Sequence, residues 1–186
     1  MKLRTGIVAL VVILASAAAN AAKLPSAANE FRQLKEATPL PKALDPAFEF
    51  RKTKLFFLGD APGPRRGGGF TGGAVRDPSI GFEGAYRLHG AVTALDQRAR
   101  FGHYFDFFWR AKRPANVTVR LEYRQQTLRS FTQAREVSYE NVKGNTKTAF
   151  AVIGDDYWAD GRITAWRCLL IENGRIVAED RSYLWR

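Results

Sequence analysis

Residues 104–110 read YFDFFWR, and every second residue from Phe105 to Trp109 is aromatic. Asp106 and Arg110 have the opposite parity. Successive side chains of a β-strand point to opposite faces of the sheet, so this alternation is typical of a strand with one buried face. The stretch therefore predicts a strand whose aromatic face belongs to the core.

The same period-two pattern recurs from Gly81 to the end of the chain and predicts about six or seven strands with short connections. An earlier short strand is expected at residues 54–58 (KLFFL). The residues expected to share a strand face are Phe82, Gly84, Tyr86 and Leu88; Val117, Val119, Leu121 and Tyr123; Thr148, Phe150 and Val152; and Trp166, Cys168 and Leu170. Turn residues separate these segments at Lys112-Arg113-Pro114, Lys143-Gly144-Asn145, Asp160-Gly161 and Asn173-Gly174.

The strongest turn signal is Asn173-Gly174, because Asn-Gly suits the two left-handed positions of a type I′ hairpin turn. We therefore expect the last two strands to pair. The pattern predicts an all-β fold over residues 55–186, a single antiparallel β-sandwich that is immunoglobulin-like in general shape. A small β-barrel is the alternative.

The N-terminus has the pattern of a signal peptide over residues 1–21. Lys2 and Arg4 precede an apolar run at 6–15, and Ala19-Asn20-Ala21 matches the A-x-A cleavage pattern. A membrane anchor is the alternative, but the run is shorter than the roughly 18 residues that a span needs. We expect the protein to be exported to a periplasmic or extracellular location, with no transmembrane span in the mature chain.

Two further segments precede the expected sandwich or interrupt it. Residues 22–54 form a lead-in, with a short helix predicted over 26–37 and an extended tether at 38–46 (TPLPKALDP), where the prolines prevent regular structure. Residues 59–73 (GDAPGPRRGGGFTGG) are predicted to form a Gly-rich loop.

Composition and motifs argue against an enzyme. The chain has 186 residues with one Cys and two His, which excludes an intrachain disulfide and a Cys-based zinc site. The G-x-G-x-x-G string at 67–72 lacks the following helix of a nucleotide site. In the calcium-loop-like stretch from Asp156, Trp158 and Arg167 stand where oxygen ligands are needed. Neither histidine has a nucleophile motif nearby. We therefore predict no catalytic residue, no metal and no cofactor, and read Cys168 as a core residue.

The charge balance points to binding. Lys and Arg number 29 against 18 Asp and Glu, a formal net charge of +11. Arg120 and Arg124 share one strand face, and Arg65 and Arg66 lie in the Gly-rich loop. We predict an exported, non-catalytic binding or accessory module of the cell envelope that contacts an anionic or protein partner through this Arg-rich face. Export argues against nucleic acid as the physiological partner.

Two alternatives remain open from the sequence. Tyr157 and Trp158 in the acidic segment, and Trp185 near the C-terminus, are candidate stacking surfaces of a carbohydrate-binding module. The second alternative is an assembly subunit whose sheet adds strands from neighbouring copies, with the lead-in as the donated strand.

Overall fold

The computed structural model describes residues 32–34, 37–59 and 78–185. The expected signal peptide, nearly all of the Gly-rich loop, and the candidate residues Arg65 and Arg66 lie outside the described residues. The secondary-structure elements are β1 (Arg32–Leu34), β2 (Phe48–Leu58), α1 (Pro78–Leu88), α2 (Ala94–Arg98), β3 (Gly102–Gln125), β4 (Gln133–Ile153), α3 (Asp155–Asp160), β5 (Ile163–Glu172) and β6 (Arg175–Arg181).

All six strands of the described residues belong to one antiparallel sheet. Its order is β1-β4-β3-β5-β6, and β2 pairs with β3 beside this path. The structure thus confirms a mostly antiparallel β fold. The sheet does not close into the barrel that the sequence left as the alternative.

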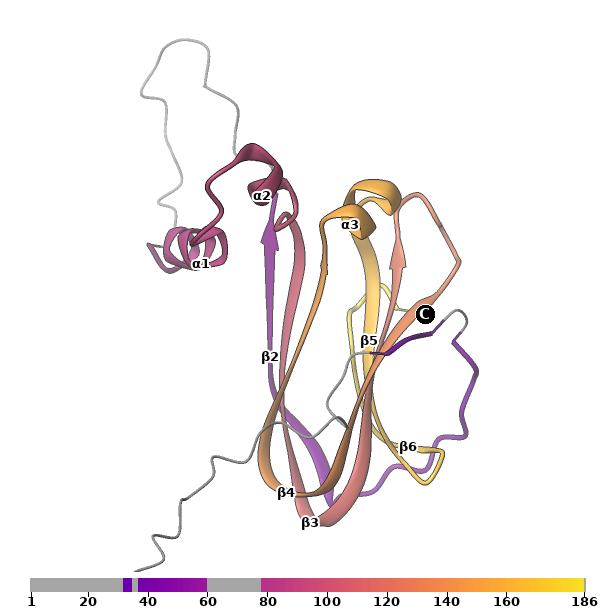
Figure 1. The fold of residues 1–186 in the computed structure, drawn as a ribbon. Helices are drawn as coiled ribbons and strands as arrows, with labels where there is room; N and C mark the ends of the chain where they lie inside the picture. Colours follow the sequence, from indigo (N-terminus) through magenta and orange to yellow (C-terminus); the bar gives the residue numbers. More distant parts are fainter. Residues whose placement is uncertain (1–31, 35–36, 60–77, 186) are drawn as a thin grey trace, which may run out of the picture.

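Strands β3 and β4 are long, and each bends so that the sheet folds back on itself. Figure 1 shows both strands running down one side of the molecule, turning at the lower end and running up the other side. The pairing register shifts between Ala111 and Val117, on either side of Pro114, which has no N–H for the ladder. The prediction of chain-reversing turns at 112–114 and 143–145 is therefore wrong, because these residues bend two continuous strands.

The core lies between the two facing halves of this sheet. Phe107 and Trp109 are fully buried and Phe105 is 2% exposed, as the alternation predicted. Phe107 packs against Trp166 at 5.6 Å between ring centroids. Cys168 is free and fully buried, which confirms its assignment to the core.

The predicted hairpin at Asn173-Gly174 is confirmed. Strands β5 and β6 pair antiparallel, with Glu172 opposite Arg175. Asn173 has a φ of 50° and Gly174 a φ of 72°. Both turn residues are therefore left-handed, as a type I′ turn requires.

The prediction of helices from the sequence is wrong in several segments. Residues 82–88 form the end of helix α1 instead of a strand, with Glu83 and Arg87 paired across one turn. The acidic segment that contains Tyr157 and Trp158 is the short helix α3. Residues 32–34 of the helix expected at 26–37 form strand β1 on the edge of β4.

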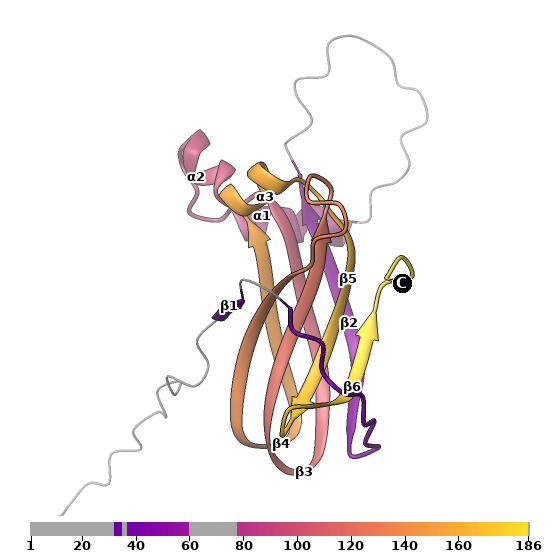
Figure 2. The ribbon, with the colours of Figure 1, turned by 90° about the vertical axis from the view of Figure 1, so that its right-hand side faces the viewer.

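Residues 37–45, here called the N-terminal strap, cross the outer face of the sheet from β1 to β6 (Figure 2). Ala43 N–H donates to the carbonyl of Ile176 at 2.9 Å, and Asp45 N–H to that of Val177 at 3.0 Å. Leu40 packs against Leu169, Ile171 and Ile176. The described part of the lead-in is thus hydrogen-bonded within its own chain.

Candidate functional site

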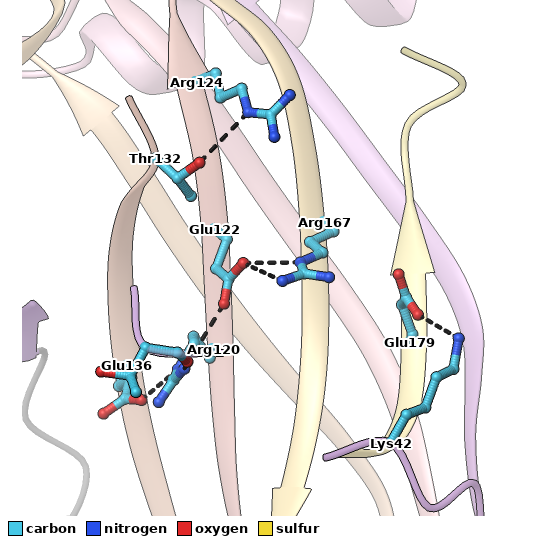
Figure 3. Close-up of polar contacts among 9 residues, drawn as sticks. Lys42, Arg120, Glu122, Arg124, Thr132, Glu136, Arg167 and Glu179 are labelled. Carbon is cyan, nitrogen blue, oxygen red and sulfur yellow. Dashed lines mark hydrogen bonds and ion pairs between the residues drawn. The ribbon is translucent and has the colours of Figure 1, made fainter. Parts of the chain in front are cut away.

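Arg120, the centre of the predicted Arg-rich face, lies within an ion-pair network beneath the strap (Figure 3). Its Nε donates to Glu136 Oε1 at 2.6 Å, and its Nη1 donates to the carbonyl of Thr38 at 3.0 Å. A second carboxylate, that of Glu122, is 3.6 Å from the same guanidinium. The residue is only 8% exposed.

Glu122 joins a second arginine to this network. It is 2% exposed, and its Oε2 accepts a hydrogen bond from Arg167 Nε at 2.7 Å. Two guanidinium groups are therefore matched by two carboxylates, those of Glu122 and Glu136 (Figure 3). The charge at this part of the face is neutralised and largely shielded from solvent, which leaves Arg120 little to offer an external anion.

Arg124 does not join the network around Arg120 but contacts Trp185, near the C-terminus. Its Nε donates to Thr132 Oγ1 at 3.3 Å, and its guanidinium lies 4.6 Å from the ring centroid of Trp185. Arg167 lies 5.0 Å from the same ring. Trp185 is 7% exposed, so the hypothesis that it offers an exposed stacking surface is wrong.

Tyr157 and Trp158 lie on α3, at the end of the sheet opposite the bend (Figure 1). Tyr157 is 9% exposed and packs edge-on to His103. Trp158 is partly exposed, and its Nε1 donates to the carbonyl of Arg98 at 3.1 Å. Both aromatic rings therefore cover one end of the core, and neither is fully exposed to solvent.

His103 lies beneath these rings and is held neutral. Its Nε2 accepts a hydrogen bond from the backbone N–H of Ile163 at 3.1 Å. Burial, together with the positive charge of Arg162, lowers its pKa to about 4. Because its acceptor nitrogen is already engaged, the ring has no free lone pair for general-base chemistry. In the part of the chain that the structure describes, no cluster of His, Cys, Asp or Glu could hold a metal ion.

A different surface carries exposed positive charge, on the outer face of β2, β3 and β4. Lys52 pairs with Phe108, which in turn pairs with Lys147, so these three residues form one rung across three strands. A shallow hollow of about 390 Å³ lies around this rung. The hollow is lined by Arg51, Lys52, Phe108, Trp109, Arg110, Asn145, Thr146 and Lys147.

We call five cations on this face the basic patch: Arg51, Lys52, Lys54, Arg110 and Lys147. Two of them are paired, Lys147 with Asp106 at 2.9 Å and Arg51 with Glu49 at 3.0 Å. For Lys52, Lys54 and Arg110, no carboxylate among the described residues lies within ion-pair distance. Counted over the described residues, the patch therefore has a surplus of three positive charges.

The partly buried ring of Phe108 forms the floor of this patch. Lys147 Nζ lies 5.6 Å and Lys54 Nζ 5.9 Å from its centroid. Sequence reasoning missed the patch because it assigned residues up to 54 to the lead-in. The exposed parity of Lys52 and Lys54 within FEFRKTKLFFL was a signal that could have indicated it.

Comparison of the chain with protein-family models, curated proteins and solved structures finds no match. The function must therefore be inferred from the geometry itself. Among the described residues, no helix is both long and apolar enough to span a membrane.

Proposed function

We propose that this protein is an exported, non-catalytic β-sandwich module of the cell envelope that binds an anionic partner through the basic patch. The observation that carries the proposal is the rung Lys52–Phe108–Lys147, flanked by Lys54 and Arg110, which have no carboxylate partner among the described residues. The signal-peptide pattern supports export. The two facing halves of the bent sheet support its description as a sandwich.

The chemistry of the patch favours phosphate, sulfate or carboxylate groups. Three cations of one face have no carboxylate partner in the described part of the chain, and they attract anions. A surface ion pair of this kind contributes about 1 kcal/mol or less on its own. Several such contacts along one ligand add up to measurable affinity that salt weakens, because exposed charges are screened. The neutralised network around Arg120 offers no comparable surplus.

The test is retention on an immobilised sulfated polysaccharide, measured as the salt concentration that elutes the protein. Replacing both Lys52 and Arg110 by alanine removes two of the three patch cations that lack a carboxylate partner among the described residues, so we expect earlier elution. The matched control replaces Arg175 and Arg181 by alanine. Both are exposed arginines of the β5–β6 hairpin, so the control removes the same amount of positive charge. We expect the control to elute close to the unmodified protein.

Two results would count against the proposal. If both double variants elute equally early, net charge alone drives retention, and the patch has no special role. If the unmodified protein is not retained at low salt, anion binding fails altogether. Circular dichroism of each variant checks that the sheet is intact.

A further inference from the structure

Helices α1 and α2 and the turn between them expose large apolar side chains. The exposed fractions are 72% for Phe82, 64% for Tyr86, 86% for Val92 and 76% for Leu95. Phe82 and Tyr86 are four residues apart in α1, so they lie on one side of the helix. Four such side chains lie within fourteen residues of sequence, and we call them together the apolar surface; exposed apolar surfaces mark interaction sites.

Phe82 and Tyr86 of the apolar surface lie on the side of α1 that faces away from the sheet. Gly84 of α1 approaches Phe56 and Leu58, where a Cβ at Gly84 would lie 3.9 and 3.8 Å from their side-chain carbons. The helix is thus seated on the sheet through its small residue. Figure 1 shows α1 and α2 beside the upper end of β2, the strand that carries Lys52 and Lys54.

Helix α1 adjoins the basic patch through two neighbouring hollows. A hollow of about 360 Å³ is lined by Lys54 of the patch, by Glu83 and Arg87 of α1, and by Asp106 of β3. A second hollow, of about 410 Å³, adjoins it through Arg87 and is lined by Tyr86, His89 and Arg100. Arg87 is paired with Glu83, and its guanidinium lies 4.4 Å from the ring centroid of Tyr104. Cationic and apolar side chains therefore share one side of the molecule.

We infer that this side docks on the surface of an anionic lipid bilayer. Apolar side chains of α1 and α2 enter the interface, and the basic patch lies against the headgroups. Charge complementarity requires an anionic occupant, and the exposed apolar side chains favour a bilayer over a soluble polyanion, which would leave Phe82, Tyr86, Val92 and Leu95 in water. Aromatic and aliphatic side chains beside Lys and Arg are the combination by which peripheral proteins bind anionic membranes. The inference rests on the proposed function and names its partner.

The experiment is flotation of the purified protein with phosphatidylcholine vesicles, with or without about one third phosphatidylglycerol. One variant replaces Phe82 and Tyr86 by serine. The matched control replaces Phe131 and Tyr183 by serine. These two residues are 49% and 88% exposed and lie outside α1 and α2. The apolar run at residues 6–15 is common to all variants, so differences between variants carry the result.

We expect binding to the anionic vesicles and much weaker binding to the neutral ones. The Phe82→Ser, Tyr86→Ser variant should bind the anionic vesicles about tenfold more weakly, because two interfacial aromatic anchors are lost. Its retention on the sulfated polysaccharide should be unchanged, and the control should match the unmodified protein in both assays.

The outcomes separate this inference from the proposed function. Retention on the polysaccharide without binding to anionic vesicles would overturn the membrane inference and leave the proposed function standing. Equal vesicle binding by both serine variants would overturn the role of α1. Failure in both assays would overturn the proposed function itself.

Discussion

Arg120 and Glu136 face each other on the paired strands β3 and β4, with Nε 2.6 Å from Oε1, and the strap residue Thr38 accepts a further hydrogen bond from the same guanidinium. Arg120, which the sequence pattern placed on an exposed strand face, is therefore buried within this network. The network joins the strap to the sheet through Thr38, and its carboxylates replace the water that the buried guanidinium has lost.

Replacement of Glu122 by glutamine should reveal how strongly this network depends on its charges. The change leaves Arg120 and Arg167 with one carboxylate fewer in a shielded position. We expect the free energy of unfolding in urea to fall by about 2 kcal/mol. The control is Glu49→Gln, which breaks the exposed pair with Arg51 and should cost about 0.5 kcal/mol or less. Equal losses for the two variants would show that the network contributes no more than a surface pair.

His103 should make the protein less stable in mild acid. Its pKa is about 4 in the folded protein against the usual 6.5, so the unfolded chain binds the proton more readily. The stability that comes from the neutral ring is complete above pH 6.5 and is lost as the pH falls from 6.5 towards 4. The loss should be about 2 kcal/mol, allowing for the ring's partial contact with solvent.

The measurement for His103 is urea unfolding at several pH values for the unmodified protein and for His103→Gln. The variant should lose less stability than the unmodified protein between pH 6.5 and 4, the window set by the two pKa values. The other histidine, His89, is exposed, and His89→Gln serves as the control. Parallel curves for His103→Gln and the unmodified protein would contradict the prediction.

Cys168 should be unreactive in the folded protein. Burial raises the pKa of its thiol, and the side chain has no exposed surface. Since the thiolate is the reactive form, a maleimide reagent should label the protein only after denaturation. A non-reducing gel should show a monomer band. Rapid labelling under native conditions, or a disulfide-linked dimer, would show that this part of the core is open.

Gly102 should be intolerant of a side chain. It opens β3 with a φ of 140°, and a Cβ there would overlap the carbonyl oxygen of Val152 and lie 2.8 Å from Ile153 Cα. We expect Gly102→Ala to cost about 3 kcal/mol or more, since the obstacle is backbone. Gly90→Ala is the control, because Gly90 also has a positive φ but, among the described residues other than its chain neighbours, no atom lies within 4 Å of its Cβ position. Its cost should be about 1 kcal/mol.

The strand faces could be predicted because they follow from local geometry. Phe105, Phe107 and Trp109 are buried as the alternation indicated. Helix α1 was missed because Phe82 and Tyr86 satisfy both a two-residue and a four-residue spacing, and seven residues are too few to separate the two periods. The bends at 112–114 and 143–145 carry turn residues, but pairing on both sides keeps each strand continuous.

The candidate site could be predicted only in part. The sequence placed Arg120 on an outward-facing parity but gave no sign of the strap, which crosses it from about eighty residues earlier in the chain. The rung Lys52–Phe108–Lys147 joins three strands that are far apart in sequence, and only their register brings these side chains together. No local pattern contains that register.

The sequence by itself determined that Phe105, Phe107 and Trp109 of β3 are buried, that β5 and β6 pair through a type I′ turn, and that the protein carries an excess of positive charge. Each of these is a property of neighbouring residues or of composition. The tertiary structure alone decided which positive charges remain free: Arg120 is neutralised by Glu122 and Glu136, whereas Lys52 has no carboxylate partner among the described residues. The physical reason is that neutralisation depends on contacts between distant segments, and those contacts exist only once the sheet has folded.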